Sequence, residues 1–125
     1  MIFVIVGYAQ GKMAFVKETW KVEEENIFHG TVPEKQGQEL TVMNDFNQWV
    51  RTIWNREEHP KDVVEAWLKN HPKGIIISDE IGNGIVPMEK EERLFRDFMG
   101  NVQIMIAKQS EEVYRVICGI GQKIK

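Results

Sequence analysis

The sequence contains little cysteine and no excess of positive charge. Its single Cys118 excludes a disulfide within the chain and is typical of proteins in a reducing compartment. The 16 Lys and Arg residues face 19 Asp and Glu residues, for a net charge of -3. No basic excess is therefore available to neutralise nucleic-acid phosphates. We expect a cytoplasmic protein that has no nucleic-acid partner.

Long apolar runs are also missing. No run approaches the roughly 20 residues that a membrane-spanning helix needs. The first apolar run, residues 2–6, has no basic residues before it and is followed directly by Gly7, unlike a secretory signal. The sequence predicts neither a membrane span nor a signal peptide.

The chain has the length and composition of one compact domain, residues 1–125. Of its 125 residues, 42% are hydrophobic and 28% are charged, which is ordinary for a globular protein. We find no internal repeat and no low-complexity segment.

Apolar residues follow strand-like and helix-like patterns in alternation. Residues 2–6, Ile-Phe-Val-Ile-Val, form a continuous apolar run that is typical of a strand buried on both faces. Residues 46–54 instead carry apolar side chains three and four positions apart, as an amphipathic helix does. Strands are predicted at 2–6, 39–43, 75–78, 113–118 and 122–125, and helices at 12–21, 46–54, 61–70 and 88–110. This alternation predicts an α/β fold with a parallel sheet; residues 21–38 give no clear pattern.

A glycine-rich loop lies between the first predicted strand and the first predicted helix. In the segment Gly-Tyr-Ala-Gln-Gly-Lys, Gly7 and Gly11 precede Lys12. Backbone N–H groups and a helix N-terminus at such a loop point at one anion, and the lysine reaches its phosphates. Met13 replaces the usual Ser or Thr, whose hydroxyl binds Mg²⁺, and a thioether is a poor substitute. The segment is either a degenerate phosphate loop or an ordinary strand-to-helix turn.

Residues 79–97 carry the most informative segment of the chain. Glu80 follows the predicted strand 75–78, and ligands of open α/β sheets collect at the carboxyl ends of strands. Arg93 and Arg96 stand three residues apart near the start of the next helix, where they could bind phosphate or a neighbouring subunit. The alternative is a structural loop with solvated acids.

Eleven residues between positions 80 and 100 together resemble a known family. In the adenosylcobinamide kinase/adenosylcobinamide-phosphate guanylyltransferase family, a strand ends in Asn-Glu-Val-Gly-x-Gly-Ile-Val-Pro and a helix then carries Arg-x-Phe-Arg-Asp-x-x-Gly. The sequence has the matching residues Glu80, Gly82, Gly84, Ile85, Val86, Pro87, Arg93, Phe95, Arg96, Asp97 and Gly100. The resemblance is strong over residues 74–125, weaker over 1–20 and gap-dependent over 38–54.

The resemblance implies a fold, ligands and a reaction. The expected fold is a P-loop (RecA-like) three-layer α/β sandwich with a mostly parallel sheet, truncated relative to the family. The expected ligands are a purine nucleotide, ATP or GTP, with Mg²⁺ in doubt because of Met13, and adenosylcobinamide. The expected activity is that of a kinase/guanylyltransferase in cobalamin biosynthesis. The alternative is a non-catalytic nucleotide-binding or assembly module with the same fold.

The same resemblance implies roles for individual residues. Asp45, after the predicted strand 39–43, would hold Mg²⁺, or would only cap the following helix. His29 weakly resembles the family's nucleophilic histidine, although the accompanying arginines are absent and the position differs by one. The expected catalytic residues are Lys12, Glu80 and His29, and the expected nucleotide-binding residues are Gly7, Gly11, Lys12, Met13, Arg93 and Arg96.

We also expect a homo-oligomer whose interface uses residues 82–100. Phe95 and Phe98 would offer apolar anchors beside the two arginines. The alternative is that both phenylalanines face the sheet of their own subunit.

Overall fold

Strands and helices alternate along most of the chain. The computed structural model describes residues 1–7, 11–35, 37, 39–80 and 89–125. The elements are β1 (Ile2–Val6), α1 (Lys12–Trp20), the 3₁₀ turn η1 (Glu24–Asn26), β2 (Ile27–His29), β3 (Val42–Asn44), α2 (Phe46–Arg56), α3 (Pro60–Asn70), β4 (Ile75–Asp79), α4 (Lys90–Gln109), β5 (Glu112–Ile117) and β6 (Ile120–Lys123).

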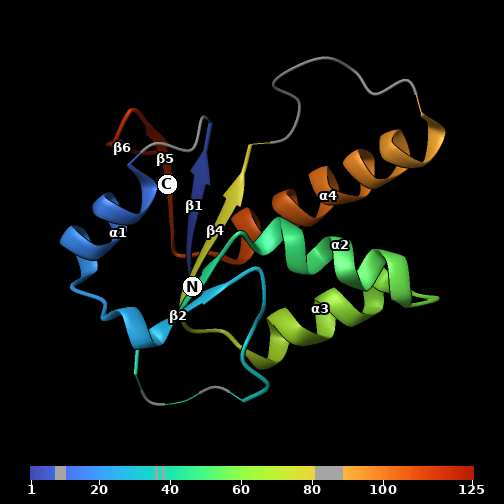
Figure 1. Cartoon of the computed structure of the whole chain (residues 1–125), viewed down its shortest axis with the longest axis horizontal. Helices are drawn as coiled ribbons and strands as arrows, with labels where there is room; N and C mark the ends of the chain where they lie inside the picture. Colours follow the sequence, from blue (N-terminus) through green and yellow to red (C-terminus); the bar gives the residue numbers. More distant parts are fainter. Residues whose placement is uncertain (8–10, 36, 38, 81–88) are drawn as a thin grey trace.

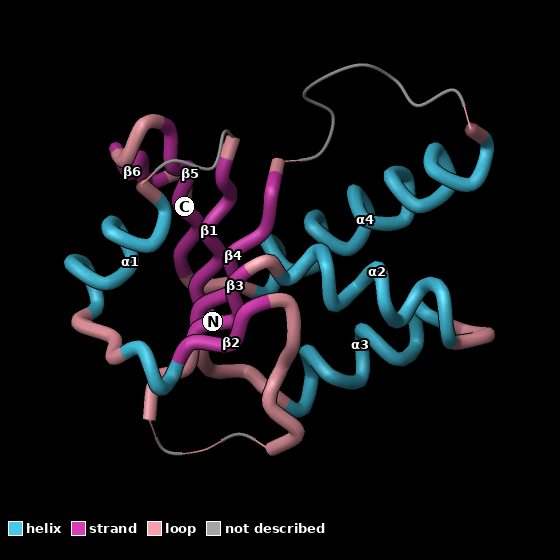
Figure 2. Tube along the Cα trace, viewed as in Figure 1, coloured by secondary structure: helices cyan, strands magenta, loops and turns pink. Residues whose placement is uncertain are grey.

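The strands form one sheet in the order β2-β3-β4-β1-β5-β6 (Figures 1 and 2). All neighbours are parallel except β6, which runs antiparallel to β5. β1 lies between β4 and β5, with Ile2 opposite both Ile75 and Glu112. The expected α/β fold with a mostly parallel sheet is confirmed, and the loop after β1 leaves the middle of the sheet.

Helices cover both faces of this sheet. Phe3 packs into a buried cluster with residues of α2, α3 and α4, whereas Val4 and Val6 pack on the other face with Val16 of α1. Figure 1 shows α1 on one side of the sheet and the three longer helices on the other. The three-layer arrangement is therefore confirmed, with one thin layer and one thick layer.

The predicted helical stripes account for the thick layer. In α2, Phe46, Val50 and Ile53 are buried, at spacings of four and three. Trp67 of α3 lies 5.4 Å from Trp49 and 5.6 Å from Phe46 between ring centroids. Such aromatic contacts bury large apolar areas, so these tryptophans serve the core.

The structure corrects the predicted strands in three places. Strand β2 occupies residues 27–29, where no pattern was visible, because three residues are too few to establish a periodicity. β3 begins at Val42 rather than at 39, and β6 covers 120–123 rather than 122–125. In each case the pairing with a neighbouring strand, rather than the local sequence, sets the bounds.

The two phenylalanines of α4 face their own subunit. Phe95 is only 7% exposed, and Arg51 of α2 lies 4.2 Å above its ring. Phe98 is partly buried, with its ring centroid 4.9 Å from that of Trp54. Phe95 is therefore not an exposed interface anchor, and the aromatic contacts of both rings are with α2 of the same chain.

The longest described helix, α4, has 20 residues. Within the described ranges, none of the helices combines enough length with enough apolar character to cross a membrane.

Candidate functional site

Lys12 is the first residue of α1, as the sequence predicts. Gly11 precedes it as the N-cap, with a φ of 89°. The first backbone N–H groups of a helix have no partner within the helix, and they point toward any anion bound there. Residues 8–10 of the loop lie outside the described residues.

Gly11 lies against the turn that joins β5 to β6. A Cβ atom at Gly11 would stand 2.5 Å from the Cα of Gly119. No side chain fits that space, and the positive φ of Gly11 favours glycine as well. The hairpin of β5 and β6 therefore supports the loop from beside it.

Lys12 forms an ion pair with Asp45, which follows β3. Its Nζ lies 2.9 Å from Oδ1 of Asp45, and the two side chains are 13% and 26% exposed. Asp45 has a φ of 53°, and its side chain makes no capping hydrogen bond to α2. The Asp45 carboxylate thus turns toward the loop lysine, against the helix-capping alternative.

Glu80 lies at the same edge of the sheet, directly after β4. Its backbone N–H donates to the Val6 carbonyl over 2.8 Å, which extends the pairing of β4 with β1. Its Oε2 accepts hydrogen bonds from Nε and Nη2 of Arg115, at 3.1 and 3.0 Å. The same oxygen lies 3.5 Å from the position that a Cβ of Gly7 would take. Glu80 is therefore next to the first glycine of the loop.

Asp79 faces a different neighbour, as the opposite directions of adjacent strand residues predict. Its Oδ2 accepts from Nδ2 of Asn47 over 3.5 Å. Asp79 and Glu80 do not form a carboxylate pair.

His29 ends β2 and lies opposite Asn44 of β3 in the strand register. The side-chain Nδ2 of Asn44 lies 2.9 Å from Nδ1 of His29, and Nε2 of His29 lies 3.3 Å from Oε1 of Glu24. Hydrogen bonds from Lys17 and then from His29 lower the pKa of the exposed Glu24 carboxyl. The buried Oδ1 of Asn44 has no partner among the described residues. His29 is thus the exposed last residue of a three-residue strand.

The remaining predicted residues lie elsewhere. Met13 packs against the apolar cluster between α1 and the sheet. Arg93 and Arg96 lie in the first turns of α4, at the opposite end of the molecule from α1 (Figure 1). The structure brings together Gly7, Gly11, Lys12, Asp45 and Glu80, but not the two arginines. The motif residues at 82 and 84–87 lie outside the described residues.

Sequence reasoning missed Arg115, the partner of Glu80. It lies on β5 opposite Ile5 of β1. A charged residue within an otherwise apolar predicted strand was the available signal. Sequence reasoning also missed Gln103 of α4, which donates to the Asp79 carbonyl over 2.6 Å.

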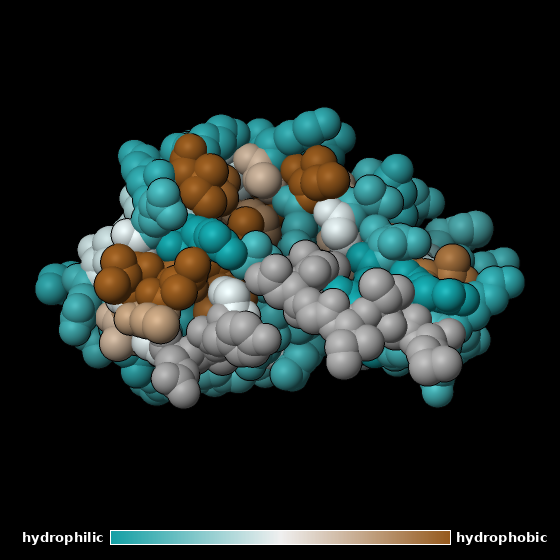
Figure 3. Space-filling view, turned by 90° about the horizontal axis from the view of Figure 1, so that it is seen from above, coloured by the Kyte–Doolittle hydropathy of each residue, from teal (hydrophilic) through white to brown (hydrophobic). Residues whose placement is uncertain are grey.

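Figure 3 views the molecule from the side of the carboxyl ends of β1 and β4. The surface there is mostly hydrophilic, with separate apolar groups on the side of α1, β5 and β6. Exposed apolar residues on that side include Ile117 and Ile120, at 45% and 73% exposure.

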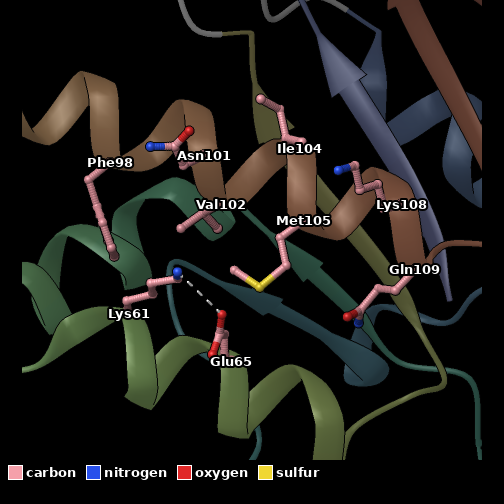
Figure 4. A pocket seen from close by; sticks show the side chains of 9 residues that line it. All are labelled: Lys61, Glu65, Phe98, Asn101, Val102, Ile104, Met105, Lys108 and Gln109. Carbon is pink, nitrogen blue, oxygen red and sulfur yellow. Dashed lines mark ion pairs between the residues drawn. The ribbon is translucent and has the colours of Figure 1, made fainter.

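A groove of about 680 Å³ lies between α3 and α4 (Figure 4). Phe98, Val102 and Met105 form its apolar floor, and Lys61 lies 3.9 Å from Glu65 at its rim. None of the predicted site residues lines this groove in the described part of the chain.

Asp45 is the one predicted metal ligand, and its chemistry fits Mg²⁺. The described residues contain no group of three or more His, Cys, Asp or Glu that could hold a metal ion. Mg²⁺ does not require such a group, because one carboxylate, water and substrate phosphates commonly hold it. Two other hydroxyl groups could in principle replace the one that Met13 lacks. Thr19, however, lies at the far end of α1, and the buried Ser78 already accepts a hydrogen bond from Gln103 over 3.1 Å.

Comparison with known proteins identifies the family of the chain. Residues 14–124 match the family described as cobinamide kinase / cobinamide phosphate guanyltransferase. The bifunctional adenosylcobalamin biosynthesis protein CobU of Salmonella typhimurium is 34% identical over 84 residues, which cover 66% of this chain and 46% of that protein. The Escherichia coli protein of the same name is 43% identical over 65 residues, which cover 52% of this chain and 36% of that protein.

The matched segments thus span less than half the length of these relatives. The family match begins two residues after Lys12. The assignment of Gly7, Gly11 and Lys12 to a phosphate loop therefore depends on the geometry described above.

Replacement of Gly11 by alanine should damage the loop. A Cβ would meet the backbone of Gly119 and would also force a residue with a side chain to a φ of 89°. We expect Gly11→Ala to lower the free energy of unfolding by about 2 kcal/mol or more. In the control, Gly37→Ala, the new Cβ meets open space, so the change should stay within about 0.5 kcal/mol. Urea denaturation of both variants measures the difference, and equal stability would contradict a close contact at Gly11.

Proposed function

The chain belongs to the cobinamide kinase / cobinamide phosphate guanyltransferase family, and from this premise we propose that it binds a purine nucleoside triphosphate at the start of α1 and acts on adenosylcobinamide in cobalamin biosynthesis. The single observation that carries the nucleotide site is the pair of Lys12 with Asp45 at the carboxyl edge of the sheet, 2.9 Å apart. A phosphate-binding lysine and a metal-binding acid act together at such a site, so their proximity supports the proposal.

The ion pair supports a phosphate site because it places the charge of Lys12 at the N-terminus of α1. Lys12 stands beside the free N–H groups of the first turn of α1, so its charge and the helix dipole favour the same anion. Without a nucleotide, Asp45 neutralises the lysine, which is only 13% exposed. In the proposed complex, the nucleotide's terminal phosphates replace Asp45 as the partner of Lys12.

Asp45 would then be available for Mg²⁺. When bound, Mg²⁺ neutralises charge on the terminal phosphates and orients them for transfer. Asp45 contributes one carboxylate to the ion, and the nucleotide and water contribute the other ligands. Met13 contributes none, because its side chain packs against the apolar cluster beneath α1. We therefore propose weak binding of Mg²⁺ by the protein itself.

For the reaction, we propose that Lys12 stabilises the phosphates while a hydroxyl oxygen of adenosylcobinamide attacks the γ-phosphorus. The bond from that phosphorus to the β–γ bridging oxygen breaks, the nucleoside diphosphate leaves, and the hydroxyl proton passes to solvent. Positioning and charge neutralisation supply most of the catalysis in such a transfer. ATP and GTP both fit this argument, because the described residues that it uses contact phosphates and not the base. Guanylyl transfer through His29 rests on the family alone, since Glu24 and Asn44 both lie within hydrogen-bond distance of its ring nitrogens.

Removal of the lysine charge should abolish nucleotide binding. A nucleotide that binds only the native state raises the melting temperature, and we expect ATP and GTP to do so for the wild-type protein. Lys12→Ala should lose this shift, whereas the control Lys61→Ala, on α3 in the groove of Figure 4, should keep it. Thermal denaturation with 0 to 5 mM nucleotide (about 100 times an expected affinity in the tens of micromolar) measures the shift. Equal shifts for the wild type and Lys12→Ala would move the nucleotide elsewhere.

Restoration of a hydroxyl at position 13 should increase the dependence on Mg²⁺. We expect Met13→Ser to bind nucleotide at least about threefold more tightly with Mg²⁺ than without, because the new oxygen ligates the ion. The variant should also unfold more easily, by about 1 to 2 kcal/mol, because an apolar side chain leaves the cluster. Titration calorimetry with and without Mg²⁺ tests this, with Met13→Leu as a packing control. An identical Mg²⁺ response in the wild type, Met13→Ser and Met13→Leu would contradict the assignment of position 13 to the metal side of the loop.

The proposal includes a cytoplasmic setting and assembly into a homo-oligomer through residues 82–100. Because Phe95 is buried, we base the interface on Leu94 of α4, which is 47% exposed. Light scattering at about 50 micromolar (a concentration at which an interface of moderate affinity is occupied) should give a multiple of the mass of one chain. Leu94→Glu should lower that mass, and a monomeric wild type would remove the assembly from the proposal.

A further inference from the structure

The pair of Glu80 and Arg115 crosses the end of the strand that leads into the loop. Glu80 follows β4, Arg115 lies on β5, and β1 runs between these two strands. Both hydrogen bonds of the guanidinium, from Nε and Nη2, go to Oε2 of Glu80. The pair therefore spans the carboxyl end of β1 immediately below Gly7, and its side chains are 25% and 37% exposed.

This arrangement creates an electrostatic problem at a phosphate site. Oε2 of Glu80 lies within van der Waals distance of the space beside Gly7, the first residue of the loop. An unpaired carboxylate there would repel a polyphosphate, and the repulsion would grow with each phosphate charge. The partly shielded position, with both side chains well under half exposed, makes screening by salt incomplete.

Arg115 removes this problem in two ways. Its two hydrogen bonds, at 3.1 and 3.0 Å, fix the direction of the Glu80 carboxylate. Its positive charge also offsets the repulsion that the Glu80 carboxylate would exert on phosphates bound at the loop. A lysine could supply the same positive charge, but without the two fixed donors of the guanidinium.

We propose that Arg115 is a positioning residue for the phosphates, which acts by holding and neutralising Glu80 beside the loop. The proposal rests on the nucleotide site proposed above and adds a residue that makes no contact with the ligand. It predicts a specific pattern: loss of Arg115 weakens binding in proportion to the charge of the ligand, and removal of the Glu80 charge reverses that loss.

The test is a double-mutant cycle read with three ligands. Calorimetric titration of AMP, ADP and ATP without Mg²⁺ into the wild type, Arg115→Gln, Glu80→Gln and the double variant gives the affinities. We expect Arg115→Gln to bind ATP about tenfold more weakly, ADP less so and AMP almost normally. The double variant should return to within about threefold of the wild type, because both charges are gone.

Two further variants separate this role from a purely structural one. Arg115→Lys keeps the charge and should bind ATP within about threefold of the wild type. Lys123→Gln removes a cation from the adjacent strand, where Lys123 pairs with Glu112 at 3.2 Å, and should leave all three affinities unchanged. A loss that is equal for AMP and ATP, or that Glu80→Gln does not reverse, would overturn the proposal in favour of simple structural damage.

The wild-type titration distinguishes failure of this inference from failure of the proposed function. If the wild type binds ATP and Arg115→Gln binds it equally well, the inference fails and the nucleotide site stands. If the wild type binds no nucleotide, sodium tripolyphosphate replaces ATP in the same cycle. Tripolyphosphate binding with the predicted pattern supports the inference and removes the nucleotide, whereas no binding by either ligand overturns both.

Discussion

The parallel pairing of β1 with both β4 and β5 is the constraint on which the rest of the site depends. Parallel strands end at the same edge of a sheet, so residues that follow them meet there although they are far apart in the sequence. Val6 lies opposite both Asp79 and Val116 in this register. A slip by one residue would turn every side chain of a strand to the other face and would separate Glu80 from Arg115. The two apolar clusters on the two faces of β1 prevent that slip.

Glycines provide the second constraint, because the loop and the C-terminal hairpin approach each other closely. Gly11 meets Gly119, and one turn further along α1 Phe15 meets Gly121, where a Cβ would stand 2.1 Å from its ring. Phe15 also contacts Trp20, with ring centroids 5.6 Å apart in an edge-on arrangement. The first helix thus lies against the hairpin at Gly11, where the backbone of Gly119 leaves no space for a side chain, and at Phe15, whose ring packs on Gly121.

Two partly shielded ion pairs then set the charge at this edge. A pair of this kind contributes little net stability, because desolvation offsets most of the attraction. Their importance lies in the arrangement of charge, because Asp45 neutralises Lys12 and Arg115 neutralises Glu80; the proposed phosphate site rests on these two pairings. Both pairs leave no unpaired charge on these four side chains, in a chain whose net charge is -3.

Local patterns in the sequence were enough to determine the alternation of strands and helices, the position of Lys12 at the start of α1 and the family. Those features depend on residues that are neighbours in the chain, such as the apolar run 2–6 and the spacing of Phe46, Val50 and Ile53. Only the tertiary structure decided which partner each charged residue takes. Lys12 and Asp45 are 33 residues apart and Glu80 and Arg115 are 35 apart, so no local periodicity connects them. The three-residue strand β2 and the burial of Phe95 beneath Arg51 were likewise decided by packing, because each depends on a neighbour that only folding supplies.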